Sequence, residues 1–286
     1  MKHQFSVRIG QIGFRVGSDW HGPIAELQHL YKGYPKPLDG VADYNVRLFA
    51  KRPWRRWLRP AVEIGGDYTL VDAAPLPLAQ GLLAAEMAMN LQLALGHRRH
   101  LLIHAACVER DGRALLMTGE SGSGKSTLAA LLSARGWRLM GDELALLDLH
   151  SGEIHAFPRL VSLKNESIAA VQAAIPSARF GPLLRDTPKG DIRHLVPDAR
   201  AVATMTTPAT PALILFPSFG FDLATRMMPR SEVFVRLTQA STNYVALGER
   251  GFRSLIGLVE KVPALAVDYA DTETGVAAIE QAWAEL

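Results

Sequence analysis

The sequence lacks the features that mark several classes of protein. It has one cysteine, Cys107, in 286 residues, so an internal disulfide is excluded and we expect a reducing compartment. Its formal net charge is only +3, weaker than dedicated nucleic-acid-binding proteins usually carry, and we expect no nucleic-acid partner. No cysteines and histidines stand at zinc-type spacing, so the sequence predicts no structural metal site.

Long uninterrupted apolar runs are also missing. The most apolar stretch, Pro75–Gly96, contains Gln80, Glu86, Asn90 and Gln92, whereas a membrane-spanning helix needs about 20 predominantly apolar residues. The opening residues, MKHQFSVRIG, lack the apolar segment of a signal peptide. We therefore expect a cytoplasmic protein without a membrane segment, in which this stretch forms a buried helix that ends at its last glycine.

The order of apolar runs and turns predicts two domains of an α/β protein. Residues 1–96 read as short strands followed by the helix just described, which together form a β-rich N-terminal subdomain. Residues 97–286 alternate strands with helices, the pattern of an α/β sheet. The segment Ala173–Ala203 holds four prolines and little periodicity, so we expect an irregular loop there. The predicted strands of the subdomain are FSVRIG, IGFRV, YNVRLFA, AVEI and DYTLV.

One segment matches the phosphate-binding motif G-x-x-x-x-G-K-S/T completely. Its residues are Gly119, Glu120, Ser121, Gly122, Ser123, Gly124, Lys125, Ser126 and Thr127. Glycines let the backbone approach a phosphate closely, and the helix that follows directs its positive end at the same anion. Lys125 is placed to reach the β- and γ-phosphates of ATP, and the Ser126 hydroxyl is placed to bind Mg²⁺.

Other motifs of nucleotide-binding proteins are absent from the sequence. It contains no N-K-x-D guanine-reading motif and no L-S-G-G-Q signature, which argues against a GTPase and against an ABC ATPase. The acidic pair Asp142-Glu143 follows the motif after only one predicted helix and the short strand WRLMG. Most P-loop ATPases place their acidic residue much further along the chain.

Residues 101–147 resemble the catalytic core of the HPr kinase/phosphorylase family. That family shows a histidine on a strand, a hairpin, the P-loop, one helix and an acidic pair; the corresponding residues are His104, the loop from Gly119 and the pair Asp142-Glu143. The segments FPRLVSLKNESI and DTPKGDIRHLVP are similar to kinases of lasso-peptide gene clusters. The resemblance implies a P-loop core of the HPr kinase/PEP-carboxykinase type and phosphoryl transfer from a nucleotide to a serine hydroxyl.

The sequence departs from the family pattern at its second acid, which is Glu143 rather than Asp. The stretch that bifunctional members use for phosphorolysis is not recognisable. The acceptor and a phosphorylase activity therefore stay open.

Candidate catalytic roles follow from the needs of phosphoryl transfer. Asp142 is the candidate for accepting or orienting the proton of the acceptor hydroxyl, and Glu143 with Ser126 is the candidate for holding Mg²⁺; the reverse assignment of the two acids stays open. His104, within an apolar strand, is either a core residue or a phosphate contact and proton partner of Asp142.

Basic residues elsewhere are candidates for phosphate and acceptor contacts. Arg159 and Lys164 are either a cationic clamp on the transferred phosphoryl group or a solvated edge, and Lys189 is a candidate for an acceptor lid. The segment Lys51–Pro60, KRPWRRWLRP, is either a docking site for an acidic partner or a surface loop that packs its tryptophans.

The sequence thus predicts an ATP- and Mg²⁺-dependent kinase that acts on a hydroxyl of a peptide, small protein or metabolite. Two alternatives are a nucleotide-binding regulatory module and a P-loop ATPase without an acceptor. A homo-oligomer and the choice of ATP over GTP also stay open.

Overall fold

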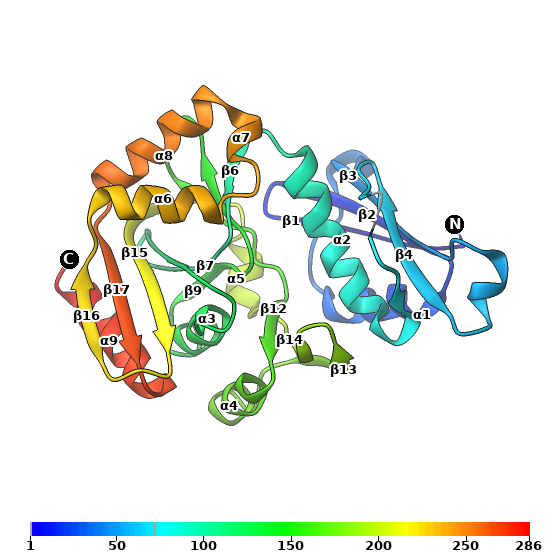
Figure 1. The fold of residues 1–286 in the computed structure, drawn as a ribbon. Helices are drawn as coiled ribbons and strands as arrows, with labels where there is room; N and C mark the ends of the chain where they lie inside the picture. Colours follow the sequence, from blue (N-terminus) through cyan, green and yellow to red (C-terminus); the bar gives the residue numbers. More distant parts are fainter. Residues whose placement is uncertain (1, 71–72) are drawn as a thin grey trace. The chain divides into compact units, whose positions relative to one another are not determined.

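The computed structural model describes residues 2–70 and 73–286 and shows a mixed α/β protein with several sheets (Figure 1). The chain divides into two compact units. The first unit comprises residues 1–97 and 179–196, and the second comprises residues 98–178 and 197–286. The hairpin around residues 179–196 thus belongs to the first unit, although it lies within the range 97–286 expected for the second domain.

The first unit is built on a five-stranded sheet in the order β1-β2-β3-β4-β5. Its neighbouring strands are antiparallel except β2 and β3. Alternate residues of β3, Tyr44, Val46 and Leu48, are buried because successive side chains of a strand point to opposite faces. The elements are β1 (His3–Ile9), β2 (Ile12–Ser18), α1 (His21–Leu30), η1 (Leu38–Gly40), β3 (Tyr44–Phe49), η2 (Pro53–Arg56), β4 (Ala61–Gly66), β5 (Leu76–Pro77), η3 (Leu78–Gln80), α2 (Gly81–Gly96), β13 (Phe180–Thr187) and β14 (Gly190–Leu195).

Several sequence-based boundaries in this unit are wrong. The expected helix from Pro75 begins at Gly81 because Leu76–Pro77 pair with β4, and it ends at Gly96 as predicted. The expected strand DYTLV is not formed over residues 67–70, and its last residue lies outside the described residues. Helix α1 was not expected, since Gly22 and Pro23 in its first turn are usual signals of a turn.

The segment Ala173–Ala203, expected to be irregular, mostly has regular structure. It contains the β13–β14 hairpin and the short helix α5 (Ala199–Ala203). Pro182 lies within β13 at a position where the pairing with β14 is interrupted, which is where a sheet tolerates a proline. The side chain of Asp198 caps α5 by accepting a hydrogen bond from the Ala201 amide.

The second unit is built on a six-stranded sheet in the order β16-β17-β15-β8-β7-β9. Strands β17, β15 and β8 are mutually parallel. Strand β7 is antiparallel to β8, and β9 is antiparallel to β7, so β9 runs in the direction of β8. The further elements are β6 (His100–Ile103), β7 (Ala105–Arg110), β8 (Arg113–Thr118), α3 (Lys125–Ala134), β9 (Arg138–Gly141), β10 (Ala145–Asp148), β11 (Ile154–His155), β12 (Val161–Lys164), α4 (Glu166–Ala174), β15 (Thr210–Phe219), β16 (Ala224–Met227), α6 (Arg230–Ala240), α7 (Tyr244–Leu247), α8 (Glu249–Lys261), β17 (Ala264–Tyr269) and α9 (Thr272–Ala284).

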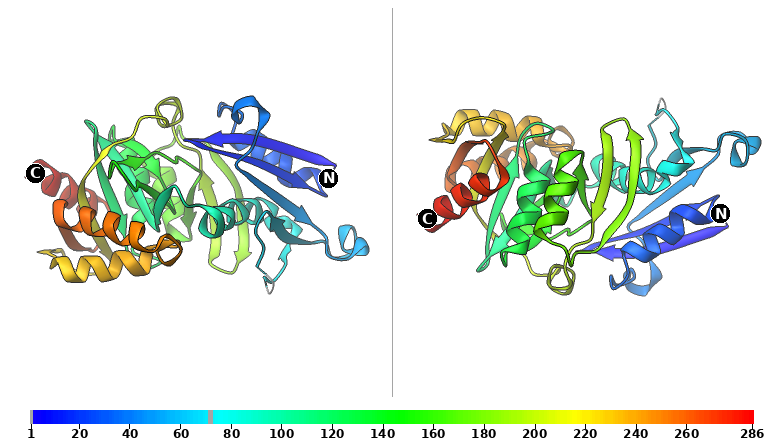
Figure 2. Two further views of the ribbon diagram at one scale, coloured as in Figure 1. Left: turned by 90° about the horizontal axis from the view of Figure 1, so that it is seen from above. Right: turned by 90° about the horizontal axis from the view of Figure 1, so that it is seen from below.

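Helices cover both faces of this sheet, as the two views of Figure 2 show: α6 and α8 lie on one face, and α3 and α9 lie on the other. Leu255, Leu258 and Val259 of α8 recur at helical spacing and are buried in one apolar cluster with Cys107 and Leu116 of the sheet. Among the described residues, no helix combines the length and apolarity that crossing a membrane requires.

A smaller antiparallel sheet, in the order β11-β10-β6, lies within the same unit. The segment LLIHAACV, which the sequence predicted to be one strand, is divided between this sheet and the six-stranded sheet. β6 ends at Ile103 and β7 begins at Ala105, so the chain changes sheet at His104. The backbone amide of His104 donates to the carbonyl of Ala240 at this junction. His104 is therefore a residue between strands, with a partly exposed side chain, and not a core residue.

Candidate functional site

Most of the predicted site residues in the second unit meet at one edge of the six-stranded sheet. Because β8 and β9 run in the same direction, Gly119 after β8 and Asp142 after β9 leave the sheet at the same edge. Strand β7 runs the opposite way, so His104 before it lies at that edge too. Tyr269 at the end of the parallel strand β17 completes the set. Ligands of α/β sheets bind at such carboxyl edges.

The loop between β8 and α3 has a backbone that requires glycine. Gly119, Gly122 and Gly124 have φ angles of 149°, 90° and 91°, in the region that other residues rarely adopt. The helix α3 then begins at Lys125, directly after the loop. Its first amides have no acceptor within the helix, and a helix start favours an anion. The loop therefore has the shape and polarity of an anion-binding turn.

Tyr269 holds this loop from a strand far away in the sequence. Its hydroxyl donates to the carbonyl of Ser123 at 2.9 Å. Burial raises the pKa of Tyr269 above its usual value, so the hydroxyl keeps its proton and remains a donor. Tyr269 was not predicted as a site residue, because the segment LAVDY carries only the signal of a strand.

Gly124→Ala tests whether this packing shapes the loop. A Cβ at Gly124 would lie 1.8 Å from the Tyr269 hydroxyl, whereas a Cβ at Gly112, whose φ of 75° is also positive, would meet nothing within 4 Å. We expect Gly124→Ala to lower the free energy of unfolding by about 1–3 kcal/mol more than Gly112→Ala in urea denaturation.

The double variant Gly124→Ala with Tyr269→Phe should recover part of that loss, since the nearest ring carbon lies 3.1 Å from the added Cβ. Equal losses in the Gly124 and Gly112 variants would contradict the assigned packing.

Lys125 places a positive charge within the loop. Its ammonium group donates to the carbonyl oxygens of Gly119 and Glu120 at 2.8 and 2.7 Å. The residue is only 9% exposed, and its position in the first turn of α3 directs the side chain back along the loop. The loop thus combines backbone amides, a helix start and a fixed cation around one small volume.

Asp142 is joined to the loop through Ser126. The Ser126 hydroxyl donates to Asp142 Oδ1 at 2.9 Å, and the Ser162 amide donates to Asp142 Oδ2 at 3.0 Å. Burial, together with the neighbouring charge of Glu143, raises the pKa of Asp142 to about 6, although these two hydrogen bonds and Lys164 oppose the shift. A buried carboxylate with a raised pKa beside a polar loop is typical of functional sites.

Glu143 and His104 form a second, more exposed pair beside Asp142. The φ angle of Glu143 is 72°, in the left-handed region that costs a side-chain-bearing residue free energy and often marks a functional position. His104 Nδ1 lies 3.0 Å from the Glu143 carbonyl oxygen and 3.6 Å from its carboxylate oxygen Oε2. Because a carbonyl only accepts, this contact places a proton on Nδ1.

The candidate basic residues differ in their placement. Lys164, at the end of β12, is near enough for its charge to lower the pKa of Asp142. Arg159 is 3% exposed, and its guanidinium group lies over the ring of Phe157. The backbone of Phe157 forms a β-bridge with Gly141, the residue before the acidic pair. Lys189 lies on the exposed turn of the β13–β14 hairpin, in the first unit.

The segment Lys51–Pro60 also belongs to the first unit and includes the short helix η2. Its tryptophans are not packed inside: Trp54 is 53% exposed and Trp57 is 79% exposed. Arg56 donates to Asp19 at 2.8 Å, whereas Arg55 is exposed and contacts the backbone of its own segment. The exposure of Trp54 and Trp57 does not fit the alternative in which this segment is a surface loop that packs its tryptophans.

An open cleft of about 950 Å³ adjoins the loop within the second unit. One wall is formed by the edge residues of the sheet and the other by α6 and the residues after it. A volume of this size holds a small molecule or a side chain of a larger one. The lining residues are His104, Thr118, Gly119, Glu120, Phe216, Ser231, Glu232, Val235, Arg236, Gln239, Ala240, Ser241 and Thr242.

Comparison with known proteins gives a family match and structural matches. No curated protein matches the sequence. A solved structure titled the Hpr(Ser) kinase/phosphatase from Coxiella burnetii aligns with 65% of this chain and 99% of its own, with 12% sequence identity and a TM-score of 0.28. The family model described as SynChlorMet cassette protein ScmC matches residues 82–243, which hold the loop, the acidic pair and His104. Since this match spans more than half of the sequence, the chain belongs to the ScmC family.

Proposed function

We propose that this protein is an ATP-dependent kinase that transfers a phosphoryl group to a hydroxyl of a peptide, small protein or metabolite. One observation carries the proposal. At one sheet edge, Lys125 is hydrogen-bonded within the glycine-rich loop, and the hydroxyl of the next residue, Ser126, donates to the buried Asp142. Phosphoryl transfer needs a phosphate cradle, charge neutralisation and a group that orients the nucleophile, and this edge has residues for all three.

The loop fits the phosphates of a nucleotide. Its three glycines have positive φ angles. Because glycine has no side chain, an anion can approach the backbone amides of the loop closely. Lys125 is already held among the loop carbonyls, and a phosphate oxygen would compete for its ammonium donors. The resemblance to the HPr kinase/phosphorylase family supports a P-loop core of that type.

The donor set at the loop also fits Mg²⁺. A hydroxyl and a carboxylate lie 2.9 Å apart at Ser126 and Asp142, and Glu143 follows with a second carboxylate. Oxygen ligands of this kind are those that Mg²⁺ prefers, and it usually keeps several waters and the phosphates of its nucleotide. Ser126 and Glu143 would hold the ion. When bound, it supplies charge neutralisation on the phosphates.

Asp142 is proposed as the group that accepts the proton of the acceptor hydroxyl. Its raised pKa, about 6, suits a general base at neutral pH because the carboxylate is ionised yet basic enough to take a proton. The hydrogen bond from Ser126 favours a second assignment, with Asp142 at the metal and Glu143 as the base. Glu143 would then act beside His104, whose Nδ1 lies 3.6 Å from its carboxylate.

The remaining polar residues are proposed to stabilise charge around the transferred group. His104 lines the cleft beside the loop, where it can contact a phosphate or relay a proton. Lys164 raises the positive potential at Asp142, and Arg159 is close to the same strand end.

The acceptor is proposed to come from the cassette that the ScmC family description names. The test is to incubate the protein with ATP labelled on the γ-phosphate, Mg²⁺ and each product of the genes beside its own. We expect label to appear on a hydroxyl of one of them, confirmed by mass spectrometry. Hydrolysis without transfer would identify an ATPase, and nucleotide binding without turnover would identify a regulatory module; either result would contradict the proposal.

Gln239→Trp tests whether the cleft beside the loop admits a substrate. Gln239 is exposed on α6 and lines the cleft, so the larger ring should fill space there without disturbing the core. We expect kcat/KM for the acceptor to fall at least about tenfold. Gln281→Trp on α9, an exposed residue on the opposite face of the sheet, is the matched control. Equal kinetics of the two variants would exclude the cleft as a substrate site.

Arg55→Glu tests the segment Lys51–Pro60 as a docking site for an acidic partner. Arg55 is chosen because its neighbour Arg56 is engaged by Asp19. We expect KM for a macromolecular acceptor to rise about two- to fivefold at low salt with ATP affinity unchanged. The effect should shrink as salt screens the charge. Arg47→Glu, exposed on β3 of the same unit, is the control with the same change in net charge.

A further inference from the structure

Three metal-ligating side chains gather on the small sheet of the second unit, apart from the loop. Strand pairing places Asp148 of β10 directly opposite His100 of β6. On the other side of β10, Leu146 is opposite His155 of β11. Since Leu146 and Asp148 are two residues apart on one strand, their side chains and those of their partners point to the same face. The register therefore brings His100, Asp148 and His155 together.

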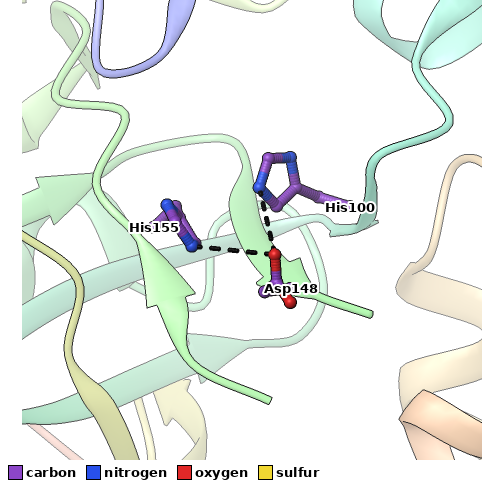
Figure 3. Close-up of side chains that lie close together, drawn as sticks. All are labelled: His100, Asp148 and His155. Carbon is purple, nitrogen blue, oxygen red and sulfur yellow. Dashed lines mark ion pairs between the residues drawn. The ribbon is translucent and has the colours of Figure 1, made fainter. Parts of the chain in front are cut away.

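The three side chains converge on one carboxylate oxygen, as Figure 3 shows. Asp148 Oδ2 lies 3.9 Å from His100 Nε2 and 3.8 Å from His155 Nε2. One ligand atom from each residue lies within 4.8 Å of the others. The imidazole rings are 4.9 Å apart, so both present a nitrogen to the same small volume.

The carboxylate is fixed in this orientation by the turn that follows β10. Asp148 Oδ1 accepts hydrogen bonds from the amides of His150 and Ser151, each at 2.8 Å. The other oxygen, Oδ2, is thereby directed toward the two histidines. Such hydrogen bonds on a ligating carboxylate are usual around metal sites, where they orient the ligand.

We propose that His100, Asp148 and His155 bind one Zn²⁺ ion. Two imidazole nitrogens and one carboxylate oxygen are ligands that zinc prefers, whereas Mg²⁺ and Ca²⁺ prefer oxygen alone. At zinc–ligand distances of about 2.0–2.1 Å the ligand atoms of a tetrahedral site lie about 3.3 Å apart. The two histidine–carboxylate distances, 3.9 and 3.8 Å, would therefore shorten by about half an ångström, and the two histidine nitrogens, which lie within 4.8 Å of each other, would approach by up to about 1.5 Å.

The surroundings leave one side of the site accessible to water. The side chain of His100 is 4% exposed, but those of His155 and Asp148 are 16% and 24% exposed. Water would therefore be the fourth ligand. The ion would join β6, which leads into His104, to β10, which follows Glu143. It would stiffen the strands beside the loop, and it does not depend on the proposed kinase function.

The test is a zinc titration of the full chain after removal of metals with a chelator, without nucleotide. Isothermal titration calorimetry should show one tight site per chain, and Co²⁺ in place of zinc should give the visible absorption of a tetrahedral ion. Asp148→Asn and His155→Ala should each weaken zinc binding at least about tenfold. Asparagine retains an oxygen for the two turn amides, and His155 is partly exposed, so both variants should fold.

Two variants control for zinc bound elsewhere. His150→Ala removes an exposed imidazole from the same turn and should bind zinc as the wild type does. His3→Ala removes one ring of the His3–His21 pair, whose centroids are 5.4 Å apart, and should also leave the tight site intact. Melting temperatures in chelator establish that each variant is folded.

Zinc should raise the melting temperature of the wild type, since a ligand that binds only the folded state stabilises it. The rise should be lost in Asp148→Asn. Failure of the wild type to take up one equivalent of zinc, or equal affinity in Asp148→Asn, His155→Ala and wild type, would overturn the proposal and leave the cluster as a contact between histidines and a carboxylate.

Discussion

Lys125→Ala is expected to abolish phosphoryl transfer, with a fall of at least about 10³-fold in turnover, while the chain remains folded. The reason is that its ammonium group is held inside the glycine-rich loop, by hydrogen bonds to Gly119 and Glu120, where we propose that the phosphates bind. Removing a preorganised group that stabilises charge in the transition state costs about two to five orders of magnitude in phosphoryl and acyl transfer.

The measurement is transfer from labelled ATP together with ATP affinity by calorimetry. Lys125→Met is a useful second variant, because it keeps the apolar stem that is buried at this position and loses only the charge. Lys261→Ala, exposed at the end of α8, is the control for loss of a lysine. Wild-type turnover and nucleotide affinity in both Lys125 variants would exclude the loop as a phosphate site.

Asp142→Asn is expected to cut turnover by about 10²–10⁴-fold while ATP·Mg²⁺ binding stays near normal. The amide is nearly isosteric and can still bond with Ser126 and the Ser162 amide, the two partners of the carboxylate, but it cannot accept a proton. Glu143→Gln should instead weaken the binding of the metal–nucleotide complex. If Asp142→Asn loses that binding and Glu143→Gln retains it, the roles of the two acids are reversed.

The pH dependence of turnover is a second test of Asp142 as the group that accepts the proton. Because burial raises the pKa of Asp142 to about 6, the carboxylate becomes protonated as the pH falls through that value. Turnover should therefore fall on the acidic side of about pH 6, and this limb should be absent from the residual activity of Asp142→Asn.

The raised pKa of Asp142 also affects the free energy of unfolding, which should fall where turnover rises with pH. The folded state holds the proton more tightly than the unfolded state, so stability falls as the pH rises from about 4 to about 6 and stays lower above it. The melting temperature of Asp142→Asn at pH 8 should accordingly equal or exceed that of the wild type. A large drop would show that the carboxylate stabilises the fold.

The sequence alone determined the local part of the candidate site. The spacing of Gly119, Gly124 and Lys125 specifies a strand–loop–helix turn, because only glycine adopts the positive φ angles that the loop has. The end of α2 at Gly96 was located in the same way, from the last glycine of an apolar stretch. Such features depend on residues that are neighbours in the chain, so a single sequence carries them.

Pairing between distant segments was decided only by the tertiary structure. The start of α2 was misplaced because Leu76 and Pro77 pair with β4 and η3 follows them, and no local signal records the partner strand. Tyr269 reaches the loop only because β17 is parallel to β15 and β15 to β8. His104 leaves its strand because the chain changes sheet there.

The cluster at Asp148 is the clearest case of this difference. Zinc-type spacing is absent from the sequence, yet His100 and His155 flank Asp148 because three antiparallel strands share one register. A side chain's face is set by its own strand, which a sequence shows, but its neighbours across the sheet are set by which strands pair and at which residue. That choice minimises the free energy of the whole unit, and only the folded structure reveals it.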